Sequence, residues 1–117
     1  MLPKAQRLNL KRDFARLTQR GQRFQNPTMQ LMVVYARPFA VGIAVGIRVV
    51  PQAVDRNRIR RLITQGVQEL LPQLPKEVQL LFIVQKNCAN WTKDQVKEVV
   101  SEICQRARLL PDKKNIL

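Results

Sequence analysis

The chain has 117 residues, with 21 Lys and Arg against 8 Asp and Glu, which leave a formal net charge of +13 at neutral pH. This length makes one domain with one modest core, and a hydrophobic content of 45% excludes a disordered basic tail. The charge exceeds the roughly 2–8 units that solubility alone needs, so we expect a polyanionic partner rather than a merely solubilising charge.

The first twenty residues predict a basic arm and a short helix. Residues 1–9 show no periodicity and are expected to form a mobile basic arm. Leu10, Phe14 and Leu17 recur at positions i, i+4 and i+7, which predicts a first helix. Gly21 is expected to end this helix as a left-handed cap.

Two strands are predicted next, at residues 29–35 and 41–47. The first is rich in apolar and β-branched residues. The second alternates strictly, with large residues (Val41, Ile43, Val45, Ile47) on one face and small residues (Gly42, Ala44, Gly46) on the other. We expect the large face to pack on the core and the small face to let a helix or a ligand approach the backbone. A further short strand near residues 48–50 is left open.

The second half predicts a helix, a strand and a helix. Residues 52–71 carry an apolar stripe with helical spacing, and residues 78–84 are nearly all apolar, as in a strand buried on both faces. Thr92 and Gln95 form a capping box at the start of the last helix, which Pro111 is expected to end.

These elements predict a single α+β domain over residues 1–117 with the order α-β-β-(β)-α-β-α, the bracketed strand being the one left open above. Residues 111–117 are expected to form a frayed tail.

Several kinds of site and location are excluded by what the sequence lacks. The chain has no histidine and therefore no imidazole base or ligand, and Cys88 and Cys104 are too few for a four-ligand zinc site. Two thiols favour a reducing compartment, with one disulfide as the alternative. No apolar run approaches the roughly 18 residues of a membrane span, and the amino terminus has no apolar signal stretch. We expect a cytoplasmic protein with no membrane partner.

The positive charge is concentrated in the first half of the chain. Residues 1–61 hold 13 basic and 2 acidic residues, for +11, whereas residues 62–117 hold 8 and 6, for +2. Solvated faces normally mix both signs. The first half is therefore expected to form the binding surface, with the second half mostly as scaffold.

The most informative segment is residues 53–63, which places four arginines and one asparagine within six positions. These residues are Arg56, Asn57, Arg58, Arg60 and Arg61. On a helix, Asn57, Arg60 and Arg61 point away from the apolar stripe, and the other two arginines lie near its edges. Guanidinium groups make bidentate phosphate contacts, and a helix beginning just before Asp55 adds free backbone N–H groups. The alternative is an ordinary helix with an arginine-rich solvent face.

This segment carries a family resemblance. The pattern A-V-x-R-N-R-x-[KR]-R-x-I follows a Gly-Ile-x-Val strand and an aromatic helix ending in Gly, and it resembles the protein subunit of bacterial ribonuclease P. The residues that carry the resemblance are Arg7-Leu8, Asp13-Phe14, Gly21, Val41-Gly42-Ile43, Ala53-Val54, Arg56-Asn57-Arg58 and Arg60-Arg61. The motifs cover roughly the first two-thirds of the chain, and the order of the elements covers the remainder.

The resemblance implies a fold and a function. It implies an α-β sandwich with a left-handed βαβ crossover, contrary to the usual right-handed rule. It also implies an accessory subunit that binds a catalytic RNA and the 5′ leader of precursor tRNA and promotes 5′-end maturation. The RNA then performs the hydrolysis with magnesium held mainly by the RNA and the substrate. No catalytic residue, no metal site and no obligatory protein partner is expected in this chain.

The resemblance further implies which residues contact each RNA. Those expected to face the catalytic RNA are Arg56, Asn57, Arg58, Arg60 and Arg61, with Arg48 as the only cation between the preceding strand and this helix. Those expected in a leader cleft between the first helix and the sheet are Phe14, Thr18, Met32, Arg12 and Arg16. Thr18 and Met32 depart from the aromatic residues common there, so base stacking would rest mainly on Phe14. Pro51-Gln52 stands where the resembled family commonly has a pair of lysines before the Ala-Val of this motif.

Two other function classes remain alternatives. A general single-stranded or ribosomal RNA-binding module would use the same arginine chemistry without a cleavage partner. A protein-only nuclease would need an acid, a base or a metal site of its own. The sequence offers no histidine, and the scattered carboxylates suggest no metal pair; Glu98 and Glu102 are expected to form solvated ion pairs.

Overall fold

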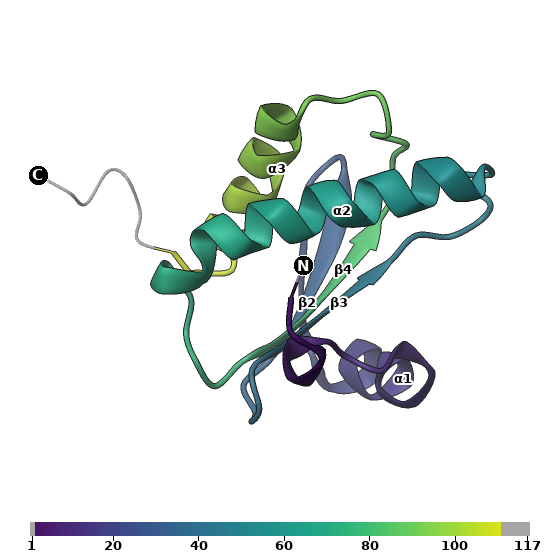
Figure 1. Ribbon diagram of the computed structural model, residues 1–117. Coiled ribbons are helices and arrows are strands. Elements are labelled where there is room, and N and C mark those ends of the chain that lie inside the picture. Colours follow the sequence, from purple (N-terminus) through teal and green to yellow (C-terminus); the bar gives the residue numbers. More distant parts are fainter. Residues whose placement is uncertain (1, 111–117) are drawn as a thin grey trace, which may run out of the picture.

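In the computed structural model, which describes residues 2–110, a four-stranded sheet separates α1 on one face from α2 and α3 on the other (Figure 1). In chain order the elements are η1 (Lys4–Gln6), α1 (Leu10–Arg20), β1 (Gln22–Gln25), β2 (Met29–Val34), β3 (Ala40–Ala44), α2 (Ala53–Leu70), η2 (Leu71–Gln73), β4 (Gln79–Val84) and α3 (Lys93–Arg106). The predicted α+β class is therefore confirmed. The tail predicted at residues 111–117 lies outside the described residues.

The strand order in the sheet is β1-β2-β4-β3. β1 and β4 both pair antiparallel with β2, whereas β3 pairs parallel with β4. Parallel strands need a crossover connection, and here α2 supplies it. Seen from the α2 side with the strand arrows pointing up, β4 lies to the left of β3, so the crossover is left-handed, as the resemblance implied (Figure 1).

The fourth strand lies elsewhere than the sequence suggested. No strand forms at residues 48–50, because the amides of Val49 and Val50 both donate to the Gly46 carbonyl and close a turn. The additional strand is β1, whose sequence Gln-Arg-Phe-Gln contains a single apolar residue, Phe24. An edge strand that buries little has a weak hydrophobic pattern, and for this reason β1 escaped prediction.

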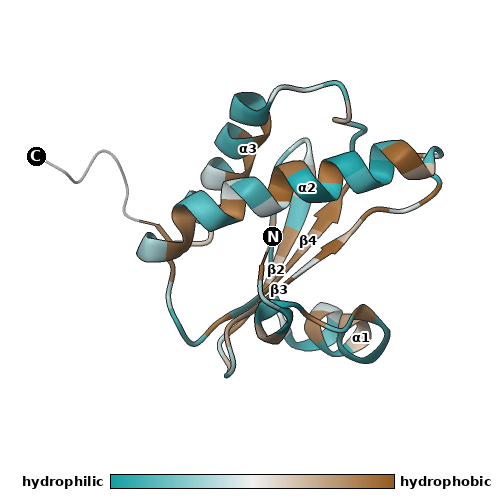
Figure 2. Cartoon of the chain, in the orientation of Figure 1, coloured by the Kyte–Doolittle hydropathy of each residue, from teal (hydrophilic) through white to brown (hydrophobic). Residues whose placement is uncertain are grey.

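The core has two layers, one on each face of the sheet. On the α2 face, Phe82 and Leu80 of β4 are completely buried together with Ile59 and Ile63 of α2. The smaller layer on the α1 face buries Leu17, Met32 and Leu81. Figure 2 shows the hydrophobic strands running beneath the hydrophobic side of α2. The expectation that residues 78–84 form a strand buried on both faces is confirmed.

The small face of β3 receives a closely packed neighbour, as the alternation predicted. A Cβ on Gly42 would lie 2.8 Å from Leu10 Cδ2 and 3.2 Å from Leu8 Cβ. Glycine therefore lets the start of α1 approach the strand. The predicted burial of Ile47 is wrong, since β3 ends at Ala44 and the side chain of Ile47 is exposed.

Gly21 ends α1 for a reason other than the one predicted. Its backbone is extended, with φ −75° and ψ 152°, and its N–H donates to the Leu17 carbonyl at 2.8 Å. A Cβ at this position would lie only 2.4 Å from the same Leu17 oxygen. The close approach of the backbone, rather than a left-handed conformation, requires glycine here.

α3 begins as predicted and ends earlier than expected. Thr92 and Gln95 form the capping box, but the helix stops at Arg106 before Pro111 is reached. The amides of Arg108 and Leu109 donate to the carbonyls of Gln105 and Cys104, which is the hydrogen-bond pattern of a Schellman cap. Arg108 takes the left-handed position, with φ 59°. Within residues 2–110 no helix combines the length and the apolar character needed to cross a membrane.

Replacing Arg108 with Gly is expected to raise the free energy of unfolding by about 0.5–1 kcal/mol, because glycine adopts this conformation without a Cβ clash. Urea denaturation measures the change. The matched substitution Gln105→Gly, inside the helix, is expected to lower the same quantity by about 1 kcal/mol. A loss of stability in the Arg108→Gly protein would contradict the assignment of the cap.

Candidate RNA interface

The arginine-rich segment forms the first half of α2. The helix begins at Ala53, and the side chain of the N-cap residue Gln52 makes no capping hydrogen bond. The first backbone N–H groups of a helix have no partner inside it, so those of α2 remain available to an anion. This agrees with the expectation that the helix begins before Asp55.

Two of the four arginines are bound to backbone oxygens of the protein. Arg56 Nη1 donates to the carbonyls of Val50 at 3.0 Å and Pro51 at 2.8 Å. Arg58 Nε donates to the carbonyl of Ala89 at 2.6 Å. These bonds hold the start of α2 to the loop before it and to the loop between β4 and α3, so both arginines position the helix.

The other two arginines project without an ionic partner. Arg61 is exposed, and Arg60 Nη1 donates to Asn57 Oδ1 at 3.0 Å. Neither forms an ion pair within residues 2–110. Arg48, on the turn before α2, is also exposed. The structure thus groups Asn57, Arg60 and Arg61 as one open, cationic face.

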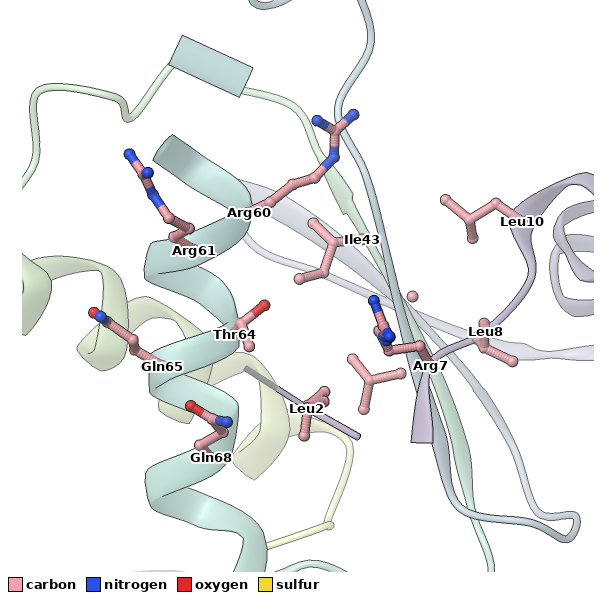
Figure 3. A pocket seen from close by; sticks show the side chains of 12 residues that line it. Leu2, Arg7, Leu8, Leu10, Ile43, Arg60, Arg61, Thr64, Gln65 and Gln68 are labelled. Carbon is pink, nitrogen blue, oxygen red and sulfur yellow. The ribbon is translucent and has the colours of Figure 1, made fainter. Parts of the chain in front are cut away.

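The amino-terminal segment lies against the sheet beside this face. Residues 2–9, predicted to form a mobile arm, are held because Leu2 is buried and the Leu8 amide donates to the Val41 carbonyl at 3.0 Å. Arg7 pairs with Val41 in a parallel bridge at the edge of β3. A pocket lies between this segment, β3 and α2, and Arg7, Arg60 and Arg61 all line it (Figure 3).

The residues predicted in a leader cleft differ in their accessibility. Phe14 of α1 is 41% exposed, whereas Met32 is 1% exposed beneath α1. Thr18 is half-buried, and its hydroxyl donates to the carbonyls of Phe14 at 3.0 Å and Ala15 at 3.1 Å. Of the three, only Phe14 presents an open side chain to a ligand, and Met32 supports the helix from below.

A half-buried row of residues crosses the α1 face of the sheet. The strand register places Gln30, Ile83 and Ala44 side by side on the α1 face, and all three are half-buried. Arg16 leaves one flank of α1, where it bonds to Gln79. Because residues two positions apart on a helix point in nearly opposite directions, Phe14 leaves the flank of α1 that lies away from Gln79.

Arg12 and Arg16 are engaged by a carboxylate that sequence reasoning missed. Arg12 Nη2 and Arg16 Nη2 each lie 3.2 Å from an oxygen of Asp13, which is buried. Arg16 also donates to Gln79 Oε1 at 2.7 Å, and Gln79 Nε2 donates to the carbonyls of Arg37 and Pro38 at 3.3 Å. Arg16 therefore anchors α1 to β4, while Arg12 keeps an exposed side chain. The signal in the sequence was that Asp13 is one of only 2 acidic residues among the first 61.

The same ion pairs shift the pKa of Asp13. The hydrogen bond from Arg12 lowers the pKa of this carboxyl most, and Arg16 lowers it further, against the opposing effect of burial. The pKa of the Arg12 guanidinium is raised by the same hydrogen bond.

The sequence of the chain is similar to those of known proteins. The sequence model of one family, Ribonuclease P, matches residues 2–108. The chain belongs to the ribonuclease P protein family. Its relatives include the ribonuclease P protein component of a Synechococcus species, which is 33% identical over 116 residues that cover 94% of this chain and 87% of that protein. The ribonuclease P protein component of Listeria innocua is 32% identical, with 97% of this chain and 98% of that protein covered.

The fold agrees with this ribonuclease P family membership. The solved RNase P protein of Staphylococcus aureus superimposes with a TM-score of 0.80, covering 92% of this chain and 100% of that chain. The sequences are 21% identical, so this likeness concerns the fold alone.

The two groups of arginines are expected to respond differently to substitution. Replacing Arg60 or Arg61 with Ala should weaken binding to a bacterial ribonuclease P RNA and reduce the slope of log K against log salt by about 0.7–0.9 for each phosphate that the side chain neutralises. The control Arg58→Ala should instead lower the melting temperature, because it removes the hydrogen bond to Ala89. Binding titrations over a salt series, with thermal denaturation, measure both. Equal slope changes in the Arg58→Ala and Arg61→Ala proteins would refute the division.

The Asp13 network predicts a pH dependence of stability. Because the folded-state pKa lies below the ordinary value of 3.8, the carboxylate stabilises the fold above that pH and loses its contribution as the pH falls through the folded-state pKa. The difference in unfolding free energy between the wild-type and Asp13→Asn proteins should be constant above about pH 5 and shrink below about pH 4. Urea denaturation from pH 7 to strongly acidic pH measures it. A difference that stays constant throughout would show that Asp13 is not titrating as described.

Proposed function

We propose that this chain is the RNA-binding protein subunit of a ribonuclease P ribonucleoprotein that matures the 5′ ends of tRNA. The observation that carries the proposal is the face of α2 formed by Asn57, Arg60 and Arg61, whose two arginines form no ion pair within residues 2–110, in a chain that matches the family along residues 2–108. Relatives that the chain covers almost end to end are named ribonuclease P protein components. The proposed partners are a catalytic RNA and precursor tRNA in the cytoplasm, with no membrane and no obligatory protein partner.

The catalytic RNA is proposed to bind α2. A guanidinium group can donate two parallel hydrogen bonds to two oxygens of one phosphate. Arg60 and Arg61 can make such contacts with RNA without first breaking an internal ion pair. Arg56 and Arg58 hold the helix in place through backbone carbonyls, so the cationic face is oriented before the RNA arrives. Exposed Arg48 extends the same surface toward the turn before α2.

The 5′ leader is proposed to lie along α1, on the opposite face of the sheet from α2 (Figure 1). There the exposed ring of Phe14 offers a surface for stacking an unpaired base. The half-buried Gln30 and Ile83 form the adjacent floor, and Arg12 supplies an exposed charge. Because the two faces lie back to back, one small domain can contact both RNAs at once.

This chain is proposed to contribute binding rather than chemistry. Within residues 2–110, no three Asp, Glu, Cys or His side chains are grouped so that they could hold a metal ion. Asp13, the buried carboxylate nearest the proposed leader path, is occupied by two arginines. The magnesium of the reaction is proposed to be held mainly by the RNA and the substrate.

Reconstitution tests the proposal. Adding the protein to its matching catalytic RNA at low magnesium should raise the cleavage rate of a precursor tRNA and the affinity for it. Phe14→Ala should weaken precursor binding by roughly 5- to 150-fold for one base stack removed and leave mature tRNA binding unchanged. Gln19→Ala, at an exposed position of α1, is the matched control.

Two outcomes would reject the proposal. No increase in cleavage or affinity would remove the ribonuclease P role. Equal binding of precursor and mature tRNA would instead indicate a general RNA-binding module.

A further inference from the structure

The pocket between the amino-terminal segment, β3 and α2 lies outside the proposed leader path. Its volume is about 460 Å³, and its lining includes Arg7, Leu8, Ile43, Arg60, Thr64 and Gln68. Pockets that hold small organic ligands run from about 300 to 1,000 Å³. The pocket therefore has room for one ligand of that size.

The walls of the pocket divide by chemistry. Leu8 and Leu10 form an apolar wall on the amino-terminal side, and Ile43 continues it on β3. Thr64 and Gln68 line the pocket from α2 with a hydroxyl and an amide, which can donate and accept hydrogen bonds. A flat ligand with an apolar face and a polar edge matches this arrangement.

Positively charged side chains line the pocket on two sides. Figure 3 shows the guanidinium of Arg60 reaching from α2 and that of Arg7 reaching from the amino-terminal segment. Within residues 2–110 neither forms an ion pair, and the lining contains no acidic side chain. The ligand should therefore carry a negative charge beside its flat part.

We propose that this pocket receives one unstacked nucleotide of the catalytic RNA. The base lies between the apolar wall and α2, its edge bonds to Thr64 and Gln68, and its phosphate is held between Arg7 and Arg60. This assignment rests on the proposed function, because Arg60 belongs both to the pocket and to the cationic face of α2. A simple phosphate site would need only the two arginines and would leave the apolar wall without a role.

Nucleoside monophosphates test the proposal directly on the full chain. AMP, GMP, CMP and UMP are titrated into the ¹⁵N-labelled protein, with ribose 5-phosphate as the probe that lacks a base. At least one nucleotide should bind at least about fivefold more tightly than ribose 5-phosphate, since a base contact is worth roughly 5- to 150-fold in affinity. The backbone amides of Leu8, Ile43 and Thr64 should shift.

Variants separate the base from the phosphate. Thr64→Phe fills the pocket and should abolish the preference for a nucleotide while leaving binding of ribose 5-phosphate unchanged. Arg7→Ala should weaken both probes. Gln19→Phe, which adds the same ring on an exposed face of α1, should change neither. Thr64→Leu replaces Thr64→Phe if the spectrum shows that the larger side chain unfolds the protein.

The outcomes also separate this proposal from the proposed function. If ribose 5-phosphate binds as tightly as every nucleotide, the pocket holds phosphate only and the proposal is overturned. Retained binding of the catalytic RNA in that case leaves the proposed function standing. Loss of all RNA binding in the wild-type protein would reject both.

Discussion

The burial of β4 on both faces is the constraint on which the rest of the structure depends. Leu80 and Phe82 face α2 and α3, whereas Leu81, between them in sequence, faces α1. Because side chains alternate along a strand, a single apolar run gives the sheet two binding surfaces for helices. The arginines of α2 and the aromatic ring of α1 are consequently held on opposite sides of one thin layer, at a separation that the sheet fixes.

The arginines of residues 1–61 have two different roles. Arg16, Arg56 and Arg58 satisfy oxygens of the protein itself and thereby fix the positions of α1 and α2. Arg60 donates to the side-chain oxygen of Asn57 on the same face, and neither Arg60 nor Arg61 forms an ion pair among the described residues. A guanidinium already bonded to the fold must lose that bond to reach a phosphate. Arg60 and Arg61, which do not tie α2 to another part of the fold, are therefore the more effective part of the cationic surface, although all the arginines contribute to its long-range field.

Much of the fold could be predicted from periodicity, whereas the partners of individual side chains could not. Helices and strands with strong apolar patterns were found, including the doubly buried strand and the capping box at Thr92. β1 was missed because an edge strand with one apolar residue carries almost no pattern. The need for glycine at position 21 was predicted, but its cause is an approach to Leu17 that only the folded backbone reveals.

In the candidate site, too, local spacing could be predicted from the sequence, whereas contacts between distant residues could not. Helical spacing correctly grouped Asn57, Arg60 and Arg61, because the relation among them is local. It could not show that Arg58 bonds to Ala89, which lies 31 positions away. Likewise, the family resemblance implies a place in the cleft for Met32, and only the packing of α1 shows that it is covered.

The pocket beside α2 illustrates why such sites are hidden in a sequence. Its walls come from three separate segments, and it exists only because Leu8 binds the edge of β3 and Gly42 admits Leu10. The amino-terminal segment is thus a wall of the site as well as part of the fold. Any ligand that bridges Arg7 and Arg60 must bind the docked segment more tightly than the undocked one, and by linkage it stabilises the docking. Recognition on the α2 face and order at the amino terminus are therefore coupled properties of this domain.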